Sequence, residues 1–137
     1  MDNCIFCKIV RKEAPATVVY EDDATLGFLS IGPNAPGHTL VIPKVHARNI
    51  LDMDEASLGS TMTTVQKVSA ALMRGLDAEG VNVIFNNEPA AHQIIFHTHA
   101  HVIPRKTGDG LHYESPEHTY GTGEAEMIAA EIRSALG

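Results

Sequence analysis

The hydrophobic pattern predicts one long amphipathic helix in the middle of the chain. Its apolar residues recur at steps of three and four, which places them on one face of a helix. Asp52 or Asp54 is suited to cap its start, and Gly80 stands just beyond its expected end, where glycine is favoured. The stripe consists of Leu58, Met62, Val65, Val68, Leu72 and Leu76.

Shorter segments on either side predict five strands and two further helical pieces. The strands are expected from β-branched and apolar runs bounded by turn residues, and the first two form a hairpin. A hairpin, a strand, a long helix and two adjacent strands indicate an α+β fold: a mainly antiparallel five-stranded sheet with the long helix packed on it. The chain shows no repeat and no linker, so we expect a single domain over residues 1–137. The expected strands are 17–21, 24–30, 38–43, 81–86 and 94–103; the helical pieces are 5–11 and about 124–136.

Composition and charge narrow the class of protein. The 137 residues are 44% hydrophobic and 20% charged, which is ordinary for a soluble globular protein. A net charge of −7 argues against binding of a nucleic acid polymer, which needs a basic face. No apolar run is long enough to span a membrane, and the first ten residues do not look like a signal peptide. We therefore expect a cytoplasmic protein with reduced thiols and no membrane partner.

Three histidines alternate in the last predicted strand. In a β-strand, residues two apart point to the same face, so His97, His99 and His101 are expected to lie side by side. Such a row could hold a metal, or it could bind a phosphate and attack it. A neutral imidazole is a competent nucleophile near pH 7 because its reference pKa is about 6.5. Neighbouring protonated histidines could neutralise the phosphate charge and donate a proton to the leaving group.

This row, His-Thr-His-Ala-His-Val-Ile, resembles the signature of the histidine-triad (HIT) family. Residues 4–9, residues 35–46 and the Asn86-Asn87 pair resemble other family segments in the expected order, so the resemblance covers a core of about residues 3–106, with a C-terminal loop and helix over 107–137. It points to the small branch that hydrolyses nucleoside phosphoramidates. That branch implies a HIT-like α+β fold and a homodimer whose sheets join.

The resemblance also implies roles for individual residues. His99 is the implied nucleophile, which forms a nucleotidyl-histidine intermediate that water then cleaves. His101 is implied to contact the phosphate and leaving group, with His38 beside the triad and Asn86 at the phosphate. Phe6, Phe28, Ser30, Ile31 and Gln93 are the implied nucleotide-binding residues, although the apolar ones could equally be plain core.

Two positions depart from the family pattern. The family usually has an aspartate, which holds the ribose hydroxyls, where this chain has neutral Ser30, and Ile94 replaces a hydroxyl residue that contacts the leaving group. These departures leave ribose selectivity and leaving-group preference open.

The two cysteines, Cys4 and Cys7, have the spacing of half a zinc site, and also that of a redox dithiol. They could also be two unrelated buried thiols. The resemblance supplies His46 and His97 as the other two ligands of a structural zinc site.

The sequence thus predicts a hydrolase for nucleoside phosphoramidates or related α-phosphate bonds. One alternative is a dinucleoside polyphosphate hydrolase using the same residues, although that branch tends to carry glutamine at the position of Asn86. The other is a nucleotide- or partner-binding module with little turnover.

Overall fold

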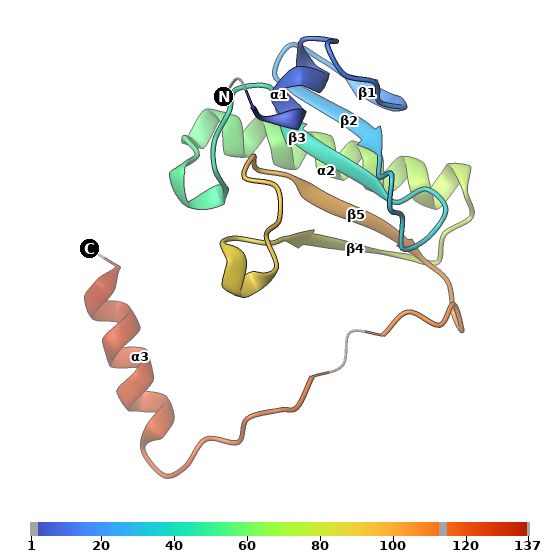
Figure 1. Ribbon diagram of the computed structural model, residues 1–137. Helices are drawn as coiled ribbons and strands as arrows, with labels where there is room; N and C mark the ends of the chain where they lie inside the picture. Colours follow the sequence, from blue (N-terminus) through green and yellow to red (C-terminus); the bar gives the residue numbers. More distant parts are fainter. Residues whose placement is uncertain (1–2, 113–114, 137) are drawn as a thin grey trace.

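The computed structural model describes residues 3–112 and 115–136 and contains the predicted five-stranded antiparallel sheet with a long helix (Figure 1). The strands are ordered β1-β2-β3-β5-β4, and every neighbouring pair is antiparallel. The strands are β1 Val18–Glu21, β2 Thr25–Leu29, β3 Thr39–Pro43, β4 Gly80–Phe85 and β5 Ala100–Arg105; the helices are α1 Ile5–Val10, α2 Glu55–Gly75 and α3 Glu124–Ala135, with short 3-10 turns at Ile50–Asp52 and Pro89–Ala91.

The two faces of the sheet carry separate apolar clusters. On one face, Val41, Ala100 and Val102 pack against the long helix α2 through its residues Val65, Val68 and Leu72. On the other face, Phe28, Leu40 and Ile42 pack against Phe6 of the short helix α1. This division follows from the alternation of side chains along each strand. Fully burying a side chain of this size stabilises the fold by about 1.5–3 kcal/mol.

Helix α2 differs in detail from its predicted pattern. Asp54, one of the two predicted caps, caps its start by accepting a hydrogen bond from the Ser57 N–H. The predicted stripe is wrong at two of its six residues, because Met62 and Leu76 are exposed. Thr61 and Thr64 are buried instead, and the Thr64 hydroxyl lies 2.7 Å from that of Thr25 in β2.

The predicted end of this helix is also wrong. The helix stops at Gly75, and Asp77 turns the chain with a φ of 53°. Gly80 is therefore not a helix cap, and it begins strand β4.

The predicted last strand is too long at its start. β5 begins at Ala100, and residues 94–99 form an irregular segment. β4 ends at Phe85, which pairs with Ala100, so residues 94–99 have no strand partner on the β4 side. Thr98 bonds instead to the carbonyl of Ala47, through both its backbone N–H (2.8 Å) and its hydroxyl (3.1 Å).

The C-terminal helix α3 forms as predicted but lies away from the sheet, at the end of a long connection (Figure 1). None of its residues is buried, and Met127, Ile132 and Leu136 beside its end are exposed. Within the described residues, no helix is long and apolar enough to cross a membrane.

The approach to β3 contains a glycine that the backbone conformation requires, and this gives a prediction. Gly37 has a φ of +96°, and a Cβ placed there would lie 2.4 Å from Cδ1 of Leu76. Gly37→Ala is therefore expected to lower the free energy of unfolding by about 1–3 kcal/mol. Gly32→Ala is the matched control, because an added Cβ meets nothing within 4 Å there. Urea unfolding of both variants measures the difference, and equal stabilities would contradict the assignment.

Candidate active site and metal cluster

The sheet places His101 on the face that carries α1. Its Cα pairs with Leu40 on one side and Ile84 on the other, while its neighbours Ala100 and Val102 point toward α2. His99 lies just before β5, and its ring centroid is 5.0 Å from that of His101. The prediction of side-by-side rings is confirmed for this pair, although the backbone that carries His99 is not a strand.

A hydrogen bond to a backbone carbonyl determines the tautomer of His99. Its Nδ1 lies 2.8 Å from the carbonyl oxygen of His97. A carbonyl can only accept, so Nδ1 carries the proton and donates. In the neutral ring, Nε2 is then left with a lone pair, which is the form that a nucleophile needs.

A second chain of hydrogen bonds orients His101. The backbone N–H of Asn34 donates to Nδ1 of His38 (3.0 Å), so in the neutral ring the proton of His38 sits on Nε2. That nitrogen lies 3.0 Å from Nδ1 of His101, to which it donates. His101 therefore carries its own proton on Nε2 and can donate from that atom.

Burial keeps these rings in their neutral forms. Removal from water lowers the pKa values of His38 and His99 below the ordinary histidine value, and the carbonyl of His97 opposes part of that effect at His99. Burial, helped by the nearby His99 and His38, lowers the pKa of His101 to about 4. All three rings are thus neutral near pH 7, which agrees with the tautomers above.

A cavity of about 560 Å³ opens in front of His99 and His101. Phe6, Phe28, Ser30, Ile31 and Asn86 line it as well, so the structure brings most of the predicted site residues to one place. His38 is buried behind His101. The remaining predicted residue, Gln93, lies elsewhere.

Gln93 is a buried residue of the loop between β4 and β5 and lies outside the cavity lining. Its side-chain oxygen accepts from the N–H of Glu88 (2.8 Å) and from Asn49 (3.1 Å), and its nitrogen donates to the carbonyls of Arg48 and Ile95. The side chain therefore holds the loop that leads to the histidines.

Sequence reasoning missed the polar network around that loop. Glu88 and His92 have φ values of 76° and 68°, a conformation that costs non-glycine residues about 1–3 kcal/mol each. Arg48 and Asn49 hold the Glu88 carboxylate, with contacts of 2.6–2.9 Å. These residues are far apart in sequence and form no motif, so the pattern carried no signal for them.

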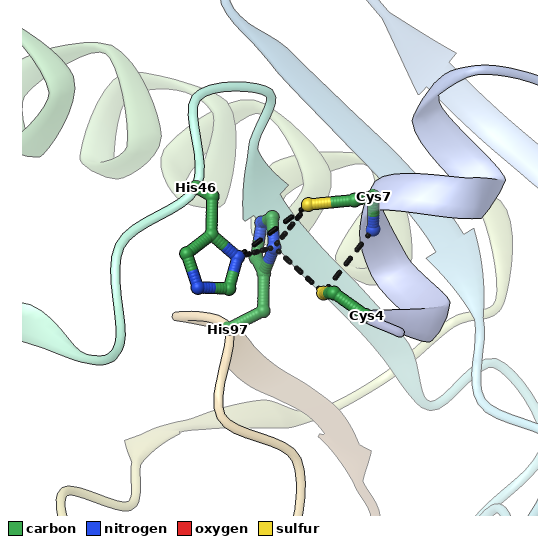
Figure 2. Close-up of side chains that lie close together, drawn as sticks. All are labelled: Cys4, Cys7, His46 and His97. Atoms are coloured by element: carbon green, nitrogen blue, oxygen red, sulfur yellow. Dashed lines mark hydrogen bonds between the residues drawn. The ribbon is translucent and has the colours of Figure 1, made fainter. Parts of the chain in front are cut away.

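Four side chains from three segments of the chain converge at one place (Figure 2). Cys4 and Cys7 come from the start of α1, His46 from the loop after β3 and His97 from the segment before β5. Their ligand atoms all lie within 4.8 Å of one another. His97 is fully buried, and its Nε2 donates to the carbonyl of Pro43 (2.8 Å), which leaves Nδ1 free to face the cluster.

The spacings in this cluster fit a tetrahedral ion. The two Nδ1 atoms are 3.2 Å apart, and three of the four sulfur–nitrogen distances are 3.4–3.6 Å. Ideal tetrahedral zinc places two nitrogens roughly 3.3 Å apart and a sulfur and a nitrogen about 3.6 Å apart. Burial raises the pKa of the Cys7 thiol, and a bound cation would reverse that effect. The four residues can therefore hold a metal ion.

Sequence comparisons agree with this geometry. The HIT domain family model matches residues 11–108, and the chain therefore belongs to the HIT domain family. An uncharacterised HIT-like protein of Borreliella burgdorferi is 45% identical over 83% of this chain and 84% of its own. An adenosine 5'-monophosphoramidase of Schizosaccharomyces pombe is 36% identical over 98% of both chains. An adenylylsulfatase of Arabidopsis thaliana is 39% identical over 80% of this chain but only 56% of its own.

Solved structures share the fold closely. A protein of Streptococcus mutans superposes with a TM-score of 0.95 at 37% identity, covering 100% of this chain and 87% of its own. A zinc-bound histidine-triad family protein of Mycobacterium smegmatis superposes with a TM-score of 0.78 at 38% identity, covering 98% of both chains.

Proposed function

We propose that the chain is a nucleotide-binding hydrolase that cleaves nucleoside phosphoramidates or related bonds at the α-phosphate. The observation that carries this proposal is the hydrogen bond from Nδ1 of His99 to the carbonyl of His97. This bond leaves the lone pair on Nε2 of His99 free, and the ring lines the cavity. The relatives named as an adenosine 5'-monophosphoramidase and an adenylylsulfatase support a substrate with an adenylyl group.

The reaction proceeds in two displacements on phosphorus. Nε2 of His99 attacks the α-phosphorus, the bond from phosphorus to the leaving nitrogen breaks, and its electron pair stays with that nitrogen. The leaving nitrogen takes a proton from solvent water, while the Nε2–H of His101, held in that tautomer by the Nε2–H of His38, donates a hydrogen bond to a phosphoryl oxygen. Asn86 donates to the phosphoryl oxygens from its place in the lining.

Water completes the cycle. It attacks the phosphorus of the nucleotidyl-histidine, the bond from phosphorus to Nε2 of His99 breaks, and His99 recovers its lone pair. One proton of the attacking water goes to solvent, which replaces the proton taken by the leaving amine, and His101 and His38 keep their neutral tautomers throughout. The net reaction converts a phosphoramidate and water into a nucleoside monophosphate and an amine.

The metal of the cysteine–histidine cluster is proposed to be a structural zinc. Cys4, Cys7, His46 and His97 form the closed Cys₂His₂ set typical of such sites, and the similar M. smegmatis protein is zinc-bound. When bound, the ion ties the start of α1 to the segment before β5. His97 thereby stays in place, and its carbonyl holds His99.

A second copy of the chain is proposed to pair with strand β4. This strand lies at an edge of the sheet, all of its residues are at least partly exposed, and Val83 in its centre is 41% exposed. An exposed edge of this kind offers unpaired backbone groups to another strand. A homodimer with a continuous sheet follows from such pairing.

The hydrolase proposal predicts a defect in His99→Ala. With adenosine 5'-phosphoramidate as substrate, kcat is expected to fall by about 10³-fold or more, because the covalent step is lost. Nucleotide binding persists in part, since His101 and Asn86 remain. His118→Ala, an exposed histidine outside the cavity, serves as control and keeps its rate. Near-wild-type turnover by His99→Ala would overturn the covalent mechanism.

The same assay separates the alternatives. Faster cleavage of a diadenosine polyphosphate than of the phosphoramidate would favour the dinucleoside polyphosphate hydrolase. Binding of AMP without turnover of either substrate would favour a binding module.

The zinc proposal predicts about one zinc per chain in purified protein by elemental analysis. Cys4→Ser is expected to lose that ion and lower the melting temperature, because a ligand of the folded state stabilises it. His118→Ala provides a control that keeps the ion. Full zinc content in Cys4→Ser would refute the ligand assignment.

The dimer proposal predicts a particle of twice the 14.7 kDa chain mass in analytical ultracentrifugation. Val83→Asp is expected to shift it toward the single-chain mass, because two carboxylates would meet across the β4 edge. Val18→Asp places the same charge at a 48% exposed position on β1, the opposite edge, and should leave the dimer intact. A single-chain mass for the unmodified protein would rule out the pairing.

A further inference from the structure

The cavity offers different chemistry at its two ends. Its polar lining at one end consists of Asn86, which follows β4, His99, which precedes β5, and His101 in β5. At the other end the lining is apolar, and Phe28 in β2 faces Phe6 of α1 with the ring centroids 5.4 Å apart. β2 and β5 are separated by β3, so Phe28 lies about 10 Å from the histidines across the sheet. Phe6 lies between them, with its ring centroid 5.2 Å from that of His99.

This arrangement orients a nucleotide in the cavity. The α-phosphate must lie at His99, which attacks it, and the base is then best placed between the aromatic and aliphatic side chains at the far end. The sugar lies between them. On that path the lining offers Ser30, which follows β2 on the same face as Phe28 and pairs with His38 through its backbone N–H (2.9 Å).

Ser30 is poorly suited to recognise two ribose hydroxyls. A vicinal diol presents two O–H donors, and a carboxylate with two oxygens is the side chain that accepts both, as in dinucleotide-binding folds. The Ser30 hydroxyl has one neutral oxygen, which already accepts a hydrogen bond from the N–H of Gly32 at 3.2 Å. The next side chain, Ile31, is apolar and fully exposed at the rim.

The rest of the described lining does not supply the missing acceptor. No aspartate or glutamate is among the described residues that line the cavity, and its other polar side chains are Asn86 and three histidines. Asn86, His99 and His101 are occupied with the phosphate in the proposed reaction. His92 is exposed, on the loop beyond β4.

We propose that this site recognises the base and the α-phosphate but not the ribose hydroxyls. Its substrates therefore include deoxyribonucleoside and other sugar-modified α-phosphoramidates, which it cleaves about as well as the ribonucleoside forms. This inference rests on the proposed hydrolase function and specifies its substrate class.

The test compares adenosine 5'-phosphoramidate with its 2',3'-dideoxy analogue on the purified, metal-replete protein. The two kcat/KM values are expected to agree within about threefold. A preference of tenfold or more for the ribose form would overturn the inference, since that ratio corresponds to about 1.4 kcal/mol of recognition of the hydroxyls.

Two variants of Ser30 sharpen the comparison. Ser30→Asp adds the absent pair of acceptor oxygens, so it should raise the ratio of ribose to dideoxy kcat/KM to about tenfold or more. Ser30→Ala should leave that ratio within threefold of one. If Ser30→Ala lowered kcat/KM for the ribose substrate alone by tenfold, Ser30 would recognise the ribose hydroxyls and the inference would be wrong.

A binding measurement separates this inference from the proposed hydrolysis. Calorimetric titrations with AMP and 2',3'-dideoxy-AMP give the ratio of the two Kd values without any turnover. Kd values that agree within threefold support the inference even if neither phosphoramidate is cleaved. Cleavage with a strong ribose preference would retain the hydrolase and refute the inference. Absence of binding to both nucleotides would refute the two together.

Discussion

The candidate site depends on one short hydrogen bond, from Nδ1 of His99 to the carbonyl oxygen of His97 (2.8 Å). It selects the tautomer in which Nε2 of His99 has a lone pair, and it prevents the ring from rotating. The carbonyl can do this because His97 is itself held at both ring nitrogens. Nε2 donates to Pro43, and Nδ1 faces the two cysteines and His46. The histidine that belongs to the metal cluster is thus also the residue that positions the proposed nucleophile.

The three histidines at alternate positions therefore have different roles. The first is buried completely and belongs to the cluster, the second lines the cavity, and the third is oriented from behind by His38. The backbone N–H of Asn34 begins that second chain of hydrogen bonds, so a loop residue contributes to the site without its side chain. Burial keeps the rings of His38, His99 and His101 neutral, so in each ring one nitrogen is a donor and the other an acceptor.

The rigidity that these contacts need comes from both faces of the sheet. The α2 face is closed by aliphatic packing, whereas the α1 face is split between an apolar cluster and the cavity. The loop between β4 and β5 carries two non-glycine residues with a positive φ, Glu88 and His92. Its strain is opposed by Arg48, Asn49 and Gln93, whose hydrogen bonds join it to the segment after β3.

The sequence by itself determined the strands, the long helix and the class of site, because these follow from local alternation, helical spacing and a dense histidine motif. Helical spacing placed Val65, Val68 and Leu72 correctly in the core, but it could not determine the borders of the buried face, and Met62 and Leu76 are exposed where the spacing predicted core. Local patterns could not show that the strand begins only at Ala100, because that depends on where β4 runs out of ladder partners. The tertiary structure also decided the tautomers and the place of Gln93. These depend on carbonyls and amides that lie far away in sequence and meet the side chains only in the folded chain.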